Sequence, residues 1–133
     1  MTDSGYEIVH TITDWYDGAR GGVADLNDKP HYYERQFDDA TDDWSAIYFL
    51  QPLDRETLVL ALEDWQIWLR WDSAFKKHKA TIETHPALPA DRERHDELSR
   101  LLADRLVIGS GYIKATADFK YGEPALVKWT VVP

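Results

Sequence analysis

Short runs of β-branched, aromatic and alternating apolar residues dominate the first fifty positions, which predicts a series of strands. Asn27 and Asp28 suit a tight hairpin turn, because both residues tolerate positive φ. The glycine-rich segment 17–22 is expected to be a loop. The expected strands of this half are residues 6–13, 23–26, 31–37 and 45–51.

The apolar pattern changes to a helical period after Pro52. We expect a helix over residues 54–78, with the Asp54 carboxylate accepting an unpaired N–H at its first turn. A second helix is expected from Pro89 to about Arg105, since proline suits the first helical position. Residues 112–120 and 125–132 then predict a final hairpin.

These elements predict a single domain, residues 1–133, of the α+β class. Strands joined by short turns pair antiparallel, so the fold is expected to be mainly an antiparallel sheet in the order β-β-β-β-α-α-β-β. A run of strands followed by helices further predicts that the two helices pack on one face of that sheet.

The expected first helix carries an unusually wide apolar face. Its apolar residues cover roughly 200° or more, whereas a surface helix needs a stripe of about 100°. The arc is centred near Trp65, and Trp65, Trp68 and Trp71 repeat along it at a spacing of three residues. Core packing explains them most simply, and the alternative is an aromatic face, including Trp68 and Trp71, that binds a partner or a second copy of the chain.

Charge is distributed unevenly, and this changes the functional interpretation. The net charge is −9, and residues 1–54 hold twelve acidic and three basic residues, so this segment carries the whole excess. Such a balance argues against a nucleic acid or an anionic membrane as partner. The loop with Asp38, Asp39, Asp42 and Asp43 either keeps the protein soluble or steers a basic protein partner.

Composition excludes further classes of protein. Cysteine is absent, which excludes disulfide scaffolds, thiolate zinc sites and cysteine nucleophiles. The sequence has no run of about 18 apolar residues, so no transmembrane helix is expected. Residues 1–5 have neither the basic nor the apolar part of a secretory signal, so we expect a cytoplasmic protein.

Acid–base candidates gather in the expected hairpin around Asn27 and Asp28. Asp25, His31 and Glu34 are competent general acids or bases, although His31 and Glu34 point to opposite faces of a strand. Asp72 and Asp64 interrupt the apolar arc of the first helix, where each needs a partner or a raised pKa. Arg35, Lys76 and the tryptophan N–H groups are the partners considered for these two carboxylates.

The segment around Arg20, Gly21 and Gly22 offers a different site. Its backbone N–H groups and the Arg20 charge could hold an anion, although no phosphate-loop or dinucleotide fingerprint is present. The five histidines have no metal-ligand spacing, so neither a metal nor a cofactor is expected. Ser110 lacks the flanking residues of a nucleophile elbow.

Three segments resemble a small family of uncharacterised bacterial proteins over about residues 12–100. They are Asp14 to Asp25 followed by Pro30 to Glu34, Leu62 to Trp71, and Thr84 to Pro89. The resemblance implies a bacterial, cytoplasmic protein and carries over no catalytic residue. Where relatives have Gly-Pro-Arg in the first segment, this chain has Ala19 in place of the proline, which weakens the case for a rigid anion-binding loop.

Two classes of function follow from these observations. Small size, high acidity and many aromatic residues favour a non-catalytic module that binds a basic protein, in the manner of an inhibitor or immunity protein. The alternative is a small-ligand binder or enzyme that uses Asp25, His31 and Glu34, or the Arg20 segment. A contiguous exposed acidic or aromatic patch would favour the first class, and a pocket with converging titratable groups the second.

Overall fold

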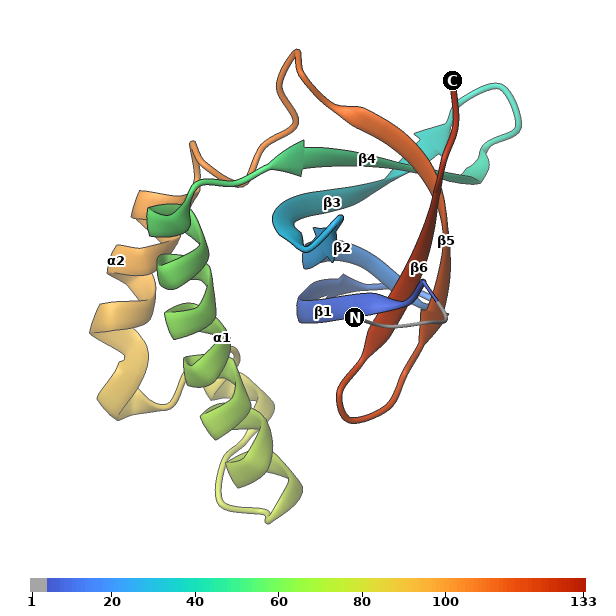
Figure 1. The fold of residues 1–133 in the computed structure, drawn as a ribbon. Coiled ribbons are helices and arrows are strands. Elements are labelled where there is room, and N and C mark those ends of the chain that lie inside the picture. The colour runs from blue at the N-terminus through green and yellow to red at the C-terminus, as the bar shows by residue number, and fades with distance from the viewer. Residues whose placement is uncertain (1–4) are drawn as a thin grey trace. The chain divides into compact units, whose positions relative to one another are not determined.

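A computed structural model describes residues 5–133 of the chain, which form two compact units. The barrel unit comprises the chain up to Asp54 and from Val107 onward, and the helical unit comprises Arg55–Leu106. The helical unit is therefore inserted between the fourth and fifth strands of the barrel unit (Figure 1). The expectation of no secretory signal concerns residues 1–5, of which the first four lie outside the described residues.

Six antiparallel strands close into a barrel, in the order β1-β2-β3-β4-β5-β6. β1 and β6 complete the circle through the pairs Glu7–Val127 and Ile8–Leu126. The elements follow one another as expected, but the α+β fold class, with an open sheet and helices on one face, is wrong. The strands are β1 Glu7–Trp15, β2 Ala19–Leu26, β3 Lys29–Asp38, β4 Asp43–Pro52, β5 Ile113–Lys120 and β6 Leu126–Val131.

The segment expected to be a glycine-rich loop is the first half of β2, so that expectation is also wrong. Gly21 and Gly22 pair with β1 on one side and with β3 on the other. A Cβ atom on Gly22 would lie 2.2 Å from the carbonyl oxygen of Thr11. Glycine is therefore needed here because two strands approach closely, and irregular pairing in β1 bends the sheet at the same place.

Aromatic and aliphatic side chains fill the barrel interior. Tyr33 is fully buried and donates a hydrogen bond from its hydroxyl to the carbonyl oxygen of Thr11 at 3.0 Å. Tyr48 donates to the carbonyl oxygen of Ala19 at 2.5 Å, and burial raises the pKa of Tyr48 to about 12. Burial also raises the pKa of Tyr33. These phenols therefore stay neutral and act as structural donors that tie β1 and β2 to the core.

The helical unit contains α1 Arg55–Lys76, α2 Arg92–Leu102 and the short 3₁₀ helices η1 Ile82–Thr84 and η2 Pro89–Asp91. Its buried anchors on α1 include Ile67 and Trp71, whereas Trp65 is only half-buried. The buried face of α1 therefore runs through Ile67 and Trp71 rather than being centred on Trp65. The Trp71 indole N–H donates to the Thr84 hydroxyl at 2.9 Å, which fixes the ring.

Ion pairs join α1 to α2 and its leading turn. Arg94 donates two hydrogen bonds to the Glu63 carboxylate, at 2.6 and 2.7 Å, and thereby lowers the pKa of Glu63. Arg70 binds Asp91 in the same two-pronged manner and lowers the pKa of that carboxyl. In the described part of the chain, no helix is long and apolar enough to cross a membrane.

Candidate functional site

Three turns of the barrel unit lie at the same end of the barrel. In an antiparallel barrel the turns β1–β2, β3–β4 and β5–β6 must all share one end, because alternate strands run in opposite directions. Side-chain contacts confirm this placement: Trp15, before the first turn, meets Tyr121, after β5, with ring centroids 4.9 Å apart. We call this region the hairpin end.

The hairpin end carries five large aromatic side chains, here called the aromatic rim. Exposure is high for Trp15 (58%), Tyr16 (61%) and Tyr121 (51%). Turns are normally polar, so large aromatic side chains this exposed are candidates for a binding surface. The aromatic rim consists of Trp15, Tyr16, Phe37, Trp44 and Tyr121.

Arg20 links the two halves of the aromatic rim. Its guanidinium carbon lies 4.4 Å from the ring centroid of Trp44 and 5.8 Å from that of Tyr16. Asp14 accepts two hydrogen bonds from this guanidinium, both at 2.8 Å. These bonds raise the pKa of Arg20, so the side chain remains charged while its charge is balanced within the site.

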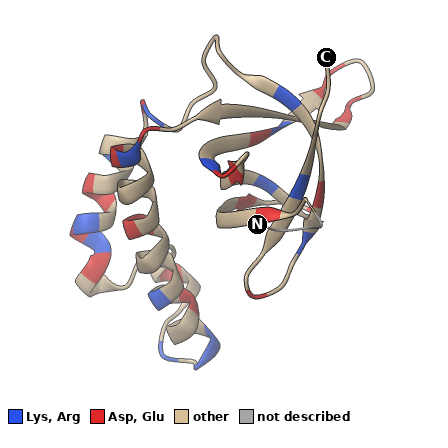
Figure 2. Cartoon of the chain, viewed as in Figure 1, with Lys and Arg blue, Asp and Glu red and all other residues tan. Residues whose placement is uncertain are grey.

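Carboxylates surround the aromatic rim. In the acidic loop, the Asp38 carboxylate accepts from the N–H of Ala40 and the Asp43 carboxylate from the N–H of Trp44. Asp39 and Asp42 are exposed, and neither makes a hydrogen bond or ion pair within residues 5–133. Figure 2 shows acidic positions in the β3–β4 hairpin and in the β5–β6 turn. The loop therefore uses two carboxylates to shape its turn and leaves two available.

A hollow of about 390 Å³ opens beside the aromatic rim, on the outer side of β2, β3 and β4. It brings together residues that the sequence placed in three different candidate sites: Arg20 and Gly21, Glu34, and Asp39. Glu34 pairs directly with Gly21 across the β2–β3 ladder, which explains the convergence. The lining residues are Asp14, Arg20, Gly21, Tyr32, Glu34, Arg35, Gln36, Phe37, Asp39 and Trp44.

The expected acid–base group does not assemble. Asp25 accepts a hydrogen bond from Nε2 of His10 at 2.8 Å. His31 is buried, with Nδ1 2.8 Å from the carbonyl oxygen of Lys29. Glu34 accepts a hydrogen bond from the Tyr32 hydroxyl at 2.9 Å, and burial together with this bond raises the pKa of Tyr32. Each candidate thus has its own separate partner.

The glycines expected to hold an anion are used by the sheet. Gly21 and Gly22 lie in β2, which is paired on both edges. Arg20, the expected source of positive charge, is already neutralised by Asp14. This segment therefore contributes to the site through the Arg20 side chain and its aromatic neighbours rather than through backbone N–H groups.

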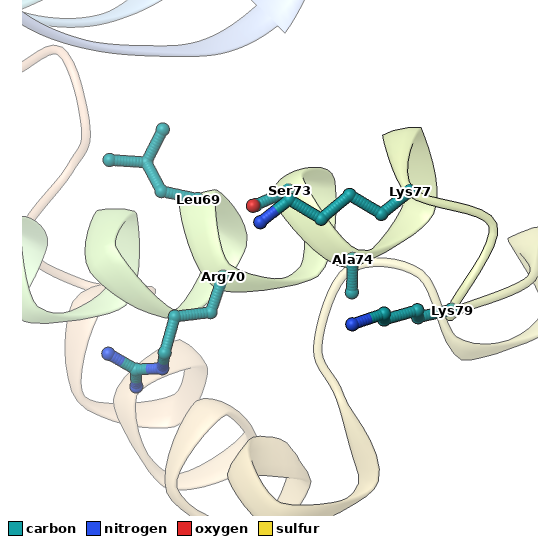
Figure 3. Close-up of a pocket in the computed structure, with 6 residues that line it drawn as sticks. All are labelled: Leu69, Arg70, Ser73, Ala74, Lys77 and Lys79. Carbon is teal, nitrogen blue, oxygen red and sulfur yellow. The ribbon is translucent and has the colours of Figure 1, made fainter.

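A second depression, of about 370 Å³, lies on the last turns of α1 (Figure 3). Arg70, Lys77 and Lys79 surround it, with the Ser73 hydroxyl beside the Lys77 side chain. Arg70 is bound by Asp91, and the lysines lie near the negative pole of the helix dipole, which they balance. The ion pair of Arg70 and the interaction of the lysines with the helix dipole therefore explain this basic group without a ligand.

The helix candidates have structural partners. The Asp72 carboxylate is 2.8 Å from the Lys76 ammonium nitrogen, one of the partners considered for it. Trp71 is buried and contacts His85 edge-on, with centroids 4.6 Å apart, so it offers no exposed face. Trp68 is half-buried and stacks on Trp65, with ring centroids 4.9 Å apart.

Asp64, His95 and Ser99 are aligned in the order of a serine hydrolase relay. Asp64 lies 2.6 Å from Nδ1 of His95, and Nε2 of that ring lies 3.4 Å from the Ser99 hydroxyl. Ser99 lies within α2, where the neighbouring N–H groups are used by the helix and cannot form an oxyanion hole. We interpret the Asp64–His95 pair as a link between α1 and α2.

Two kinds of residue were missed from the sequence. The aromatic rim had a local signal, because Asp14-Trp15-Tyr16-Asp17 places two large aromatics at a turn between two acids. The His10–Asp25 pair had none, since it depends on the β1–β2 register.

Among residues 5–133, no three histidine, aspartate or glutamate side chains are grouped to hold a metal ion. No protein-family model, curated protein or solved structure matches this chain.

Proposed function

We propose that the protein is a non-catalytic binding module whose hairpin end holds a basic segment of a partner protein, as an inhibitor or immunity-type protein does. The observation that carries the proposal is the aromatic rim, a group of large aromatic side chains at one end of the barrel, most of them exposed, with carboxylates in the same turns. Such a surface suits lysine and arginine side chains, because their alkyl stems pack on aromatic rings while their charged ends reach carboxylates.

The distribution of charge supports a basic partner. The barrel unit contains fourteen acidic and six basic residues, whereas the helical unit contains ten and nine. Within the barrel unit, segments 14–20, 38–43 and 118–123 of the hairpin end together contain eight acidic and two basic residues. This negative field raises the rate of encounter with a basic surface and repels acidic ones.

The enzyme alternative has less support from the geometry. Its residues Asp25, His31 and Glu34 each bind a different neighbour, so a substrate would not meet an acid and a base together. The barrel interior is filled by side chains such as Tyr33, Leu50 and Val127, each less than 2% exposed. A binding surface at the hairpin end agrees better with these contacts.

Titration of ¹⁵N-labelled protein with acetyl-hexalysine amide tests the proposal, with the neutral peptide acetyl-hexacitrulline amide as control. We expect saturable shifts of the Trp15 and Trp44 indole signals and binding that weakens steeply with salt. Trp15→Ala is expected to weaken binding about fivefold, the equivalent of one cation–π contact. Tyr112→Ala removes a 38% exposed aromatic residue at the other end of β5 and should leave affinity within about twofold.

General attraction between a polycation and an acidic protein must be distinguished from a site. If Trp15→Ala and Tyr112→Ala change affinity equally, or if the shifts do not centre on the aromatic rim, the proposal is wrong. A citrulline peptide that binds as well as the lysine peptide would also contradict it, because the proposed recognition requires positive charge.

A further inference from the structure

The hollow beside the aromatic rim contains both used and unused polar groups. The Arg20 guanidinium is held by Asp14, and the Arg35 Nε donates to the carbonyl oxygen of Ser45 at 2.7 Å. Both cationic side chains of the lining therefore already have an oxygen partner. Arg20 is balanced by Asp14, whereas Arg35 keeps its charge because its partner is a neutral carbonyl. Within the described residues, the lining carboxylates without an ion pair are those of Glu34 and Asp39, so they outnumber the one unbalanced cation.

These two carboxylates have acceptor capacity to spare. Glu34 receives one hydrogen bond, from Tyr32 to Oε2, and Oε1 has no donor within the described residues. Asp39 has neither a hydrogen bond nor an ion pair anywhere in residues 5–133. Two carboxylates with open lone pairs on the wall of one hollow favour a ligand with several N–H donors.

Aromatic rings supply the other half of the recognition. Phe37 is 44% exposed and meets Trp44 edge-on, with ring centroids 5.2 Å apart. Beside them, Arg20 shows how a guanidinium is held on this surface: its carbon lies 4.4 Å from the centroid of the Trp44 ring, while Nε and Nη2 of one edge both donate to the Asp14 carboxylate. The molecule thus already contains one arginine held by a ring and a carboxylate.

We infer that the hollow is a specificity site for an arginine side chain of the basic partner, with Glu34 and Asp39 as its carboxylate acceptors and Phe37 as its aromatic contact. This inference rests on the proposed function and names the residue that the partner must present. A planar guanidinium has five N–H donors and can reach two separate carboxylates while stacking on a ring. A lysine ammonium is a compact point charge with three donors on one nitrogen, and it has no plane that could stack on the ring.

The test compares acetyl-hexaarginine amide with acetyl-hexalysine amide, which carry the same charge, by calorimetry and by NMR. Wild-type protein should bind the arginine peptide about tenfold more tightly, the equivalent of one additional charge-assisted hydrogen-bonded contact. Glu34→Gln keeps an acceptor for the Tyr32 hydroxyl and should remove most of this preference. Asp39→Asn should lower the preference in the same direction.

The matched control is Glu93→Gln, which removes the same charge from an exposed position in the helical unit. It should lower both affinities alike and keep the arginine preference. Equal affinity of the wild-type protein for the two peptides, or an unchanged preference in Glu34→Gln with a native ¹⁵N spectrum, would overturn the arginine site. The lysine peptide would still bind at the aromatic rim in that case, so the proposed function and the arginine site fail separately.

Discussion

Replacing Gly22 with alanine should strongly destabilise the barrel unit. The added Cβ would lie 2.2 Å from the carbonyl oxygen of Thr11 and 2.9 Å from the Tyr33 hydroxyl. Both neighbours are buried, and the Thr11 carbonyl is backbone that cannot rotate away. β1 and β2 must therefore separate by about 1 Å before the contact becomes an ordinary one.

The loss in free energy of unfolding can be estimated from the contacts that this separation of β1 and β2 disrupts. Overpacking a well-packed site costs about 1–3 kcal/mol. The hydrogen bond from Tyr33 to Thr11 would lengthen, and a buried hydroxyl without its acceptor costs a further 1–3 kcal/mol or so. We expect a loss of about 3–5 kcal/mol, a large fraction of the stability of a domain of this size.

Urea unfolding followed by the NMR signals of barrel amides, such as Val23 and Leu50, measures this loss in the barrel unit itself. Gly111→Ala is the matched control, because nothing lies within 4 Å of its added Cβ, and it should stay within about 0.5 kcal/mol of wild type. Adding Tyr33→Phe to Gly22→Ala should cost less than the sum of the two single changes, since the hydroxyl is one of the clashing atoms. A Gly22→Ala protein within about 1 kcal/mol of wild type would refute the close approach of these strands.

Four further predictions concern the charge and the helical unit. Changing all four aspartates of the acidic loop to asparagine should slow association of the hexalysine peptide more than it speeds dissociation, measured by stopped flow; an unchanged on-rate and salt slope would leave the loop as a solubility feature. Trp71→Ala should destabilise the helical unit by about 3–5 kcal/mol in urea and the half-buried Trp65→Ala by clearly less; the reverse order would contradict the observed burial. The pKa values of Glu63 and Asp91 lie below their ordinary 4.5 and 3.8 because each carboxylate is paired with an arginine. The stabilisation from these two ion pairs is therefore complete above about pH 5 and is lost as pH falls through the lowered pKa values. Thermal melts at several pH values should show that Glu63→Gln removes part of this acid sensitivity. Asp54→Ala should cost about 1 kcal/mol, because α1 begins directly after Asp54, and an unchanged melt would exclude Asp54 as its N-cap.

Local patterns were sufficient to predict where most elements lie. The alternation around Tyr33 predicts β3, and the change of period after Pro52 predicts α1, because both patterns depend on residues close in the chain. Closure of the barrel was not predictable in this way. It depends on the pair Glu7–Val127, whose members are at opposite ends of the chain, and nothing in either segment identifies the other.

The candidate site was predicted in pieces. Arg20, Glu34 and Asp39 were all selected from the sequence, each for a different chemistry, and the hollow brings them together. Their convergence depends on the register that sets Gly21 opposite Glu34, and register is decided by tertiary packing. The glycines of β2 were misjudged for the same reason, since a close approach to Thr11 has the same sequence signature as a flexible turn.

The insertion of the helical unit between β4 and β5 has a consequence for synthesis of the chain. Four strands leave the ribosome before β5 and β6 exist, and until then β1 and β4 are unpaired edges, which are sites of aggregation. Contacts within the helical unit, such as Glu63–Arg94, are closer in sequence than the pair Glu7–Val127 that closes the barrel, so this unit can form during the interval. Near the two ends of the helical unit, Nη2 of Arg105 lies 3.4 Å from Oε1 of Glu56. Folding of the insertion therefore brings the end of β4 and the start of the segment leading to β5 close together. A nascent chain that folds its helices first thus shortens the time during which the strand edges stay open.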